Sequence, residues 1–346
     1  MTDEHGAEQP APRPRAVGPR GAQPDPYAGL DAPDSAWNRA AARTTQGDPF
    51  CCRTEWALSF HETFAPHRRL RLHADGGNVL AFADGFHFRL GFLLEPVESH
   101  WLFGNPLLGT DAVALLVYWL TALAAVSERP SVLLGGVLPR SAQRRSLLAA
   151  FGDGYRIHRL QPTTLCRASL DGGLDGWLSR RSPRLRRNVR AAARKAADDG
   201  VTYERHAPTD ATGSDAIYAR MLAVEERSWK GIGRCGMAEP PSREFYRVML
   251  RRLAVSGAGR VIFARHGEED VGFVFGGVAG RVYRGQQFSY VEEWIRSSIA
   301  NLLQFEQIRW LCEENASRYD MGPLMDYKRH WTERHPMLET WVLQPR

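Results

Sequence analysis

Hydrophobic and polar positions change their spacing several times along the chain, and these changes predict its helices and strands. Residues 69–97 alternate between apolar and polar side chains and are interrupted by glycine turns, which is typical of an antiparallel meander. Residues 112–126 are continuously apolar or small, but the run is shorter than the ~20 residues that a membrane span needs. We therefore expect a buried core helix there and no membrane span.

The second half of the chain repeats a helix-then-strand order. The pattern predicts helices at 183–199, 242–255 and about 297–314, a helix ending near Trp229, and strands at 201–206, 259–266, 270–280, 281–290, 318–322 and 337–344. Helices thus precede a meander of three strands, and one long helix then crosses over to a further strand. This order indicates an α+β (mixed α/β) fold and argues against a doubly wound parallel sheet.

The first 49 residues differ in composition from the rest. Residues 1–49 contain eight prolines and few large apolar side chains, so they cannot bury enough surface to offset their ordering entropy. We predict disorder there, with at most one helical turn near Trp37, and order from Phe50 onward. Two units follow, at residues 50–170 and 171–346.

The positive charge of the chain is concentrated in one segment. The formal net charge is +6, yet residues 180–195 alone hold eight basic side chains and no acidic one, so the remainder is slightly acidic. A protein coated with nucleic acid would be basic over most of its surface. Within the segment Arg186, Arg190 and Arg194 recur every four residues, so one helical stripe is wholly cationic and needs either solvent or an anionic partner.

The cysteines, the histidines and one glycine-rich stretch limit the kinds of site that the chain can contain. The five cysteines form no C-x-x-C pair and the histidine spacings suit no standard site, so we expect neither a metal site nor disulfides, and a cytoplasmic protein without a signal peptide. Residues 231–236 spell G-x-G-x-x-G, but they follow a helix and lead into two prolines. A dinucleotide site needs a strand before this motif and a helix after it, so we interpret the segment as a flexible loop.

Three stretches resemble one family. They are LSRRSPRLRRNVRAAARKAADDGV (178–201), EERSWKGIG (225–233) and YDMGPLMDYKRHWTE (319–333). They are similar to the GNAT-superfamily acyltransferases, in particular the BioF2-like, cellulose-biosynthesis-type acetyltransferases related to the Fem peptidoglycan aminoacyltransferases. The resemblance implies two tandem GNAT-like halves, each a mostly antiparallel twisted sheet flanked by helices.

The resemblance also implies a donor site at the start of the long helix. In such enzymes the strand before this helix splays from its neighbour, and backbone N–H groups at the helix start hold the donor pyrophosphate. The corresponding residues are Arg296, Ser297, Ser298, Ile299, Ala300 and Asn301. Ile299 stands where glycine is expected. The implied co-substrate is acyl-CoA, with an acyl carrier protein or aminoacyl-tRNA as alternatives, and no tightly bound cofactor.

Candidate catalytic and substrate-binding residues come from the same stretches. Tyr327 could reprotonate a leaving thiolate, and Lys328 could hold a phosphate or carboxylate. Trp331 comes four residues after Tyr327, so we expect it on the same helical face, packed in the core. Asp320 is either a cap or a base, and Glu226 either a solvated side chain or a proton acceptor for an ammonium group. The expected substrate-binding residues are Trp229, Lys230, Arg284, Gln286, Arg186 and Arg190.

Three functions fit these patterns. The first is an N-acyltransferase in which an amine attacks a thioester and a backbone N–H of residues 281–290 stabilises the carbonyl oxygen. The second is a Fem-like aminoacyltransferase that uses aminoacyl-tRNA, with residues 180–195 binding the RNA. The third is a non-catalytic binding module of GNAT shape. The partners would be a small-molecule or peptide amine and, at the basic helix, tRNA or a carrier protein.

Overall fold

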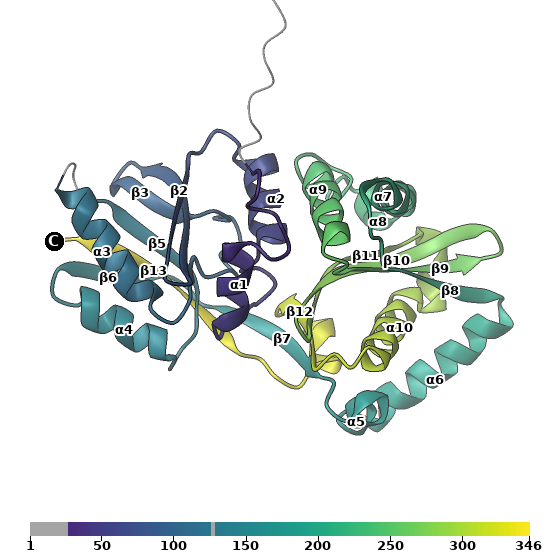
Figure 1. Cartoon of the computed structure of the whole chain (residues 1–346). Coiled ribbons are helices and arrows are strands. Elements are labelled where there is room, and N and C mark those ends of the chain that lie inside the picture. The colour runs from purple at the N-terminus through teal and green to yellow at the C-terminus, as the bar shows by residue number, and fades with distance from the viewer. Residues whose placement is uncertain (1–26, 126–128) are drawn as a thin grey trace, which may run out of the picture.

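The computed structural model describes residues 27–125 and 129–346, together with the backbone but not the side chain of Arg296. Two halves, each a sheet with helices against it, share strands (Figure 1). The α-helices are α1 Ala36–Arg43, α2 Thr54–Phe64, α3 Ala112–Ala124, α4 Ala142–Phe151, α5 Gly173–Ser179, α6 Pro183–Asp198, α7 Ala211–Glu226, α8 Trp229–Ile232, α9 Ser242–Val255 and α10 Ile299–Glu313. Two 3₁₀ helices are η1 Glu292–Ser297 and η2 Asp326–His330.

The strands form one sheet in the order β1-β2-β3-β5-β13-β7-β12-β11-β10-β9-β8. Their bounds are β1 Leu70–Asp75, β2 Asn78–His87, β3 Gly91–Pro96, β4 Leu107–Leu108, β5 Ser131–Val137, β6 Tyr155–Arg159, β7 Thr163–Ser169, β8 Val201–His206, β9 Gly259–His266, β10 Glu269–Ala279, β11 Val282–Tyr290, β12 Arg318–Pro323 and β13 Met337–Pro345. In the described chain β3–β5 and β11–β12 pair in parallel, and the other named pairs are antiparallel. The predicted mixed α/β fold is confirmed.

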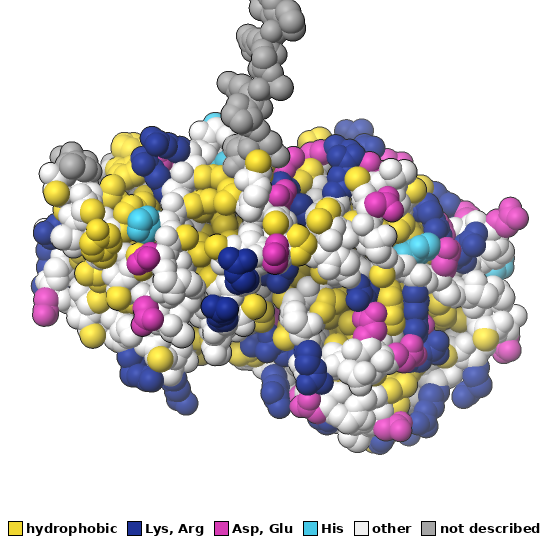
Figure 2. All heavy atoms as spheres, in the orientation of Figure 1, with side chains coloured by type: hydrophobic (Ala, Val, Ile, Leu, Met, Phe, Trp, Pro, Cys, Tyr) yellow, Lys and Arg dark blue, Asp and Glu magenta, His cyan; other side chains and the backbone are white. Residues whose placement is uncertain are grey.

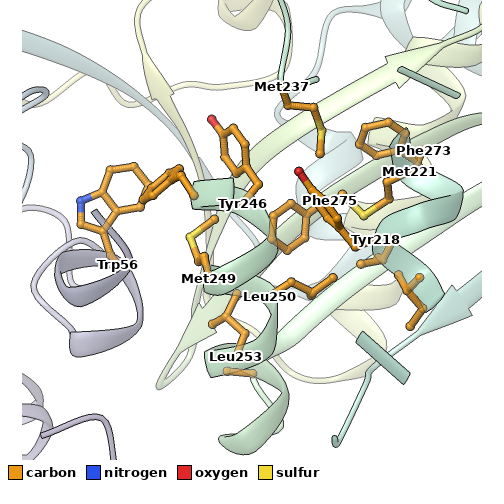
Figure 3. Close-up of a cluster of buried hydrophobic side chains, with 14 of the residues drawn as sticks. Trp56, Tyr218, Met221, Met237, Tyr246, Met249, Leu250, Leu253, Phe273 and Phe275 are labelled. Carbon is orange, nitrogen blue, oxygen red and sulfur yellow. The ribbon is translucent and has the colours of Figure 1, made fainter. Parts of the chain in front are cut away.

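The helices of the second half cover both faces of its sheet. Figure 1 shows α7, α8 and α9 on one face and α10, with α5 and α6, on the other. Sulfur-containing and aromatic side chains of α7 and α9 pack on Phe273 and Phe275 of β10 (Figure 3). The first half joins this core through Trp56 of α2, whose ring centre lies 5.2 Å from that of Phe245 on α9. No helix of the described residues is long and apolar enough to cross a membrane.

The two halves exchange strands, which the linear division at residues 170 and 171 did not foresee. Strand β7 belongs to the first half by sequence, yet it pairs with β12 of the second. Strand β13, the last of the chain, pairs with β5 and β6 of the first half. A cut after residue 170 would therefore separate β13 from the strands of the first half and β7 from those of the second.

The predicted start of order at Phe50 is wrong for residues 27–49, whereas residues 1–26 lie outside the described chain. Ser35 caps α1 by accepting a hydrogen bond from Asn38 N, and Trp37 is buried with its Nε1 donating to Cys52 O at 2.8 Å. Asp48 is buried in an ion pair with the second half. The composition argument averaged over all 49 residues, and the proline-rich average concealed a short segment with one aromatic anchor and one buried charge.

Candidate active site

A cavity opens where two neighbouring strands part. Strands β11 and β12 are paired only as far as Arg284 opposite Asp320, and beyond that point they diverge. The cavity between them has a volume of about 310 Å³. Its lining comprises Trp229, Lys230, Val274, Gly285, Gln286, Gln287, Phe288, Gln304, Tyr319, Met321, Met325, Tyr327 and Lys328. Five of the predicted site residues therefore meet here, namely Trp229, Lys230, Gln286, Tyr327 and Lys328.

A bulge shapes the wall that β11 provides. The pairing with β10 shifts between Phe275 opposite Gln287 and Gly276 opposite Gly285, so Gln286 has no partner in the ladder. A bulged residue leaves its backbone groups unpaired and bends the strand, which makes backbone donors available to a ligand. The side-chain Nε2 of Gln286 is buried without a hydrogen-bond partner among the described residues.

Lys328 is a buried amine at the cavity. It lies in η2, and its Nζ donates a hydrogen bond to the carbonyl oxygen of Pro323 at 2.9 Å. Burial, and secondarily the positive charge of Arg284, lowers the pKa of Lys328 to about 8. About a tenth of the side chain is therefore neutral at pH 7, far more than for a free lysine, and a neutral amine can accept a proton.

Tyr327 also lines the cavity, and its hydroxyl is available to a ligand. Its ring packs against Phe288 with 6.1 Å between ring centres, and within the described chain its hydroxyl makes no hydrogen bond. Burial raises the pKa of Tyr327 to about 12, so the hydroxyl keeps its proton and can donate it. The ammonium of Lys328 lies 5.8 Å from the Tyr327 ring centre, which places a proton donor beside a proton acceptor.

Helix α8 brings Trp229 and Lys230 to the opposite rim. Ser228 caps this short helix by accepting from Lys230 N and Gly231 N. The Nζ of Lys230 donates to Phe288 O at 2.5 Å and to Gln287 Oε1 at 3.4 Å, and burial lowers its pKa. Trp229 stays half exposed at the mouth of the cavity.

Arg284 and Asp320 lie at the point of divergence but outside the cavity lining. The Nε of Arg284 donates to Asp48 Oδ2 at 2.8 Å, and the Nε of Arg167 donates to Asp320 Oδ2 at 2.9 Å. Asp320 also accepts from Gly322 N, as the cap interpretation required. Arg284 and Asp320 thus both lie in buried ion pairs outside the lining, and Asp320 makes the contact expected of a cap. Substrate binding by Arg284 and proton transfer by Asp320 stay predictions.

The buried glutamate of α7 is Glu225, one position before the predicted candidate Glu226. Glu226 is exposed and does not line the cavity, as the alternative of a solvated side chain expects, and its role as a proton acceptor stays a prediction. Its neighbour Glu225 is fully buried and accepts from Met237 N at 2.8 Å. A Cβ at Gly236 would lie 2.0 Å from Glu225 Oε1, so the last glycine of the G-x-G-x-x-G stretch allows this carboxylate to hold the loop.

The predicted donor loop begins α10. Ser298 takes a left-handed backbone conformation (φ 59°), and the helix starts at Ile299. Ile299 is buried against Gly272 of β10, which explains an apolar side chain in place of glycine. Its side chain therefore belongs to the core, and a role in donor binding through its backbone N–H stays a prediction. Ser297 and Ala300 are half-buried and Asn301 is exposed, while the side chain of Arg296 lies outside what the structure describes.

The basic helix α6 does not contribute to the cavity lining. It packs against α10 and η1, close to the predicted donor loop. In the described structure none of its Lys and Arg side chains forms an ion pair or a hydrogen bond, including those of Arg186 and Arg190. Dark blue side chains gather at the lower right of Figure 2, where α6 runs in Figure 1. The cationic face is therefore available to an anion beside α10 and η1.

The polar residue that α10 contributes to the cavity, Gln304, was missed. Its Oε1 accepts from the Tyr319 hydroxyl at 2.6 Å, and the buried Gln307 on the same helix accepts from the Tyr283 hydroxyl in the same way. A glutamine among Leu302, Leu303 and Ile308 was the available signal. Among the described residues no group of His, Cys, Asp and Glu side chains could hold a metal ion.

Comparison with known proteins now assigns the fold. Residues 183–329 match the family described as an acetyltransferase (GNAT) domain. The matched residues cover less than half of the chain, but they include every residue of the cavity lining. The similarity to acetyltransferase domains identifies the chain as an acyltransferase of GNAT type. A search of curated proteins finds no match.

Several solved structures share the fold over most of the chain. The structure of FemX is 12% identical, with a TM-score of 0.62, over 88% of this chain and 94% of that one. L-PGS from Bacillus licheniformis is 15% identical, with a TM-score of 0.54, over 86% of this chain and 92% of that one. The C-terminal DUF2156 domain of a proposed lysylphosphatidylglycerol synthetase from Agrobacterium fabrum is 14% identical, with a TM-score of 0.55, over 89% and 90%. These likenesses extend the fold to both halves, while the cellulose-biosynthesis branch stays a prediction.

Proposed function

We propose that the chain transfers an acyl group from a thioester donor, acyl-CoA or a carrier protein, to an amine acceptor bound in the cavity between β11 and β12. The observation that carries this proposal is the pairing of Lys328 and Tyr327 at the cavity of the acetyltransferase domain. One has a pKa low enough to accept a proton and the other a pKa high enough to keep one. The amine acceptor and the acyl donor are the two substrates that such a pair serves.

The chemical step follows from these groups. The amine nitrogen attacks the thioester carbonyl carbon, and the backbone N–H of the bulged Gln286 stabilises the oxygen that becomes negative. Neutral Lys328 takes the proton from the attacking nitrogen as the C–N bond forms. The C–S bond then breaks and the Tyr327 hydroxyl protonates the sulfur. Transfer of the proton from Lys328 to the Tyr327 oxygen returns both residues to their starting states.

The charge of the cavity favours an uncharged acyl group over an aminoacyl group. An aminoacyl donor carries an α-ammonium, which is normally bound by a carboxylate. Among the described residues the lining of the cavity contains no Asp or Glu, and it does contain Lys230 and Lys328. Nearby cations also lower the pKa of a bound amine and thereby favour its nucleophilic form.

The Fem-like aminoacyltransferase remains the second candidate because of α6. Its unpaired cations beside α10 would suit the phosphates of a tRNA as well as those of CoA. Protein that retains RNA after purification, with an absorbance maximum near 260 nm that salt removes, would favour this candidate. The non-catalytic module, the third candidate, requires that no donor reacts.

The test is release of free thiol from acyl-CoA in the presence of a panel of amines, with mass spectrometry of the products. Lys328→Met should lower turnover by about 10²–10⁴-fold, the usual contribution of a general base. Tyr327→Phe should lower turnover while the donor still binds. Arg329→Met is the matched control, because Arg329 lies in the same 3₁₀ helix and its side chain is half exposed. Equal turnover in Lys328→Met and Arg329→Met would reject Lys328 as the base.

A further inference from the structure

The charges that line the cavity all have one sign. Lys230 of α8 and Lys328 of η2 contribute two amines, and no described lining residue is an Asp or a Glu. Outside the lining, Glu225 accepts from Met237 N through Oε1, while its Oε2 is buried without a hydrogen-bond partner among the described residues, and Asp320 is paired with Arg167. A cation-rich cavity repels an acceptor whose charged groups are all ammonium groups. It attracts an acceptor that also carries an anionic group.

We propose, on the basis of the acyl transfer inferred above, that the acceptor is an amine bearing a carboxylate or phosphate in the same molecule, and that Lys230 binds this oxyanion. Polyamines and simple alkylamines would then be poor substrates. The shared chemistry of the two anions is a set of oxygen acceptors that an ammonium group can bind by charge-assisted hydrogen bonds.

Lys230 is better placed than Lys328 to hold a static charge. An ammonium has three N–H donors. Two of those on Lys230 are used by Phe288 O and by Gln287 Oε1, which leaves one for a ligand. The position of Gln287 is fixed in turn, because its Nε2 donates to the Tyr246 hydroxyl at 2.6 Å.

The surroundings also help Lys230 to keep its proton. Burial lowers its pKa, and the carboxylate of Glu225 opposes that effect. For Lys328, burial and then Arg284 lower the pKa to about 8, although the carboxylate of Asp320 opposes them. One lysine thus suits binding of an anion, and the other suits transfer of a proton beside Tyr327.

The size of the cavity limits the acceptor. A volume of about 310 Å³ corresponds to roughly ten water molecules, since one water occupies about 30 Å³ of liquid. An amino acid of ordinary size or a small amino phosphate fits this space. A larger acceptor would place only its amine end and one anionic group inside, with the remainder beyond the half-exposed ring of Trp229.

The experiment compares matched amines that differ in one charge. Thiol release from acetyl-CoA is measured with 4-aminobutyrate against n-butylamine and with O-phosphoethanolamine against ethanolamine. Wild-type protein should prefer the anionic member of at least one pair by tenfold or more in kcat/KM, and the preferred pair identifies carboxylate or phosphate. Lys230→Met should reduce the preference to threefold or less by slowing only the anionic amine, whereas Lys230→Arg should retain most of it. Arg234→Met is the matched control, since Arg234 is an exposed cation in the turn just after α8 and outside the lining.

A second readout does not depend on turnover. Saturation-transfer NMR with N-acetylglycine and N-methylacetamide as product-like probes should show binding of the anionic probe alone, and Lys230→Met should remove it. Equal use of both amines in each pair, or a preference that survives Lys230→Met, overturns the anion site while leaving acyl transfer intact. If no amine releases thiol but N-acetylglycine still binds through Lys230, the anion site stands and the proposed transfer fails.

Discussion

Replacing Asp48 with asparagine should destabilise the whole chain, although Asp48 lies in a segment whose composition suggested disorder. The carboxylate joins the segment between α1 and α2 to Arg284 on β11, with 5% and 1% of the Arg284 and Asp48 side chains exposed. Burial alone would raise the pKa of Asp48, but Arg284, together with the Cys51 N–H and Arg167, outweighs burial and holds the pKa below its usual value. Both groups are therefore charged in the folded protein at neutral pH.

The magnitude follows from burial. Removing one partner of a buried ion pair typically costs about 3–5 kcal/mol, because the other charge is left without compensation. A domain of ordinary stability has about 5–15 kcal/mol in total, so the loss would be a large fraction of it. The double variant Asp48→Asn/Arg284→Met removes both charges, and its loss should be smaller than the sum of the single losses by about 0.5–3 kcal/mol.

The assay is urea unfolding of the four proteins of this cycle, followed by circular dichroism. Glu244→Gln is the control, since its ion pair with Arg247 is on the surface and should contribute at most about 1 kcal/mol. A loss below 1 kcal/mol for Asp48→Asn would show that the segment does not depend on this contact. A stable Arg284→Met with a tenfold higher acceptor KM would place Arg284 among the substrate-binding residues.

Three further predictions address the site and its frame. At saturating acceptor the rate should rise with pH to a plateau with a midpoint near 8, because only neutral Lys328 accepts a proton. Lys328→Met should remove that rise, and a flat wild-type profile would contradict the assignment. The double variant Arg186→Glu/Arg190→Glu should raise the donor KM by tenfold or more at low salt and by less at high salt. The unfolding midpoint should change little because neither side chain is paired in the described structure. An unchanged KM would show that α6 does not bind the donor. Gly322→Ala should destabilise the protein by about 1–3 kcal/mol, as φ is +78° and a Cβ would lie 2.5 Å from the Arg284 guanidinium; an unchanged urea midpoint would contradict this packing.

Local pattern predicted the elements well, and it located one wall of the cavity. The alternation in residues 69–97 became β1 to β3, and the predicted long helix at 297–314 became α10 within two residues. The stretch 319–333 brought Tyr327 and Lys328 to the cavity because a short strand, a turn and a 3₁₀ helix follow one another there. Each of these features depends on residues that are close in sequence.

The remaining features depend on contacts between distant residues. Nothing in the spacing of charged residues shows that Arg284 is paired with Asp48, since the two are joined only when the halves dock. Adjacent Glu225 and Glu226 differ by about 100° around α7, and a short local pattern does not fix which of them turns inward. The exchange of β7 and β13 is likewise decided by the packing of the whole sheet.

The first half supports a cavity to which it contributes no lining residue. The last paired residues of β11 and β12 are Arg284 and Asp320, and each is bound by a side chain from the first half by sequence, Asp48 for one and Arg167 for the other. Arg167 also donates to the carbonyl oxygen of Gly47, the residue before Asp48, so this hydrogen bond connects the two ion pairs. Because the strands part immediately beyond this point, the position of the two pairs sets the angle between the cavity walls. The distance from Lys328 to the bulged Gln286 therefore depends on the docking of the halves, and a substitution in residues 44–49 should change acyl transfer without touching either substrate.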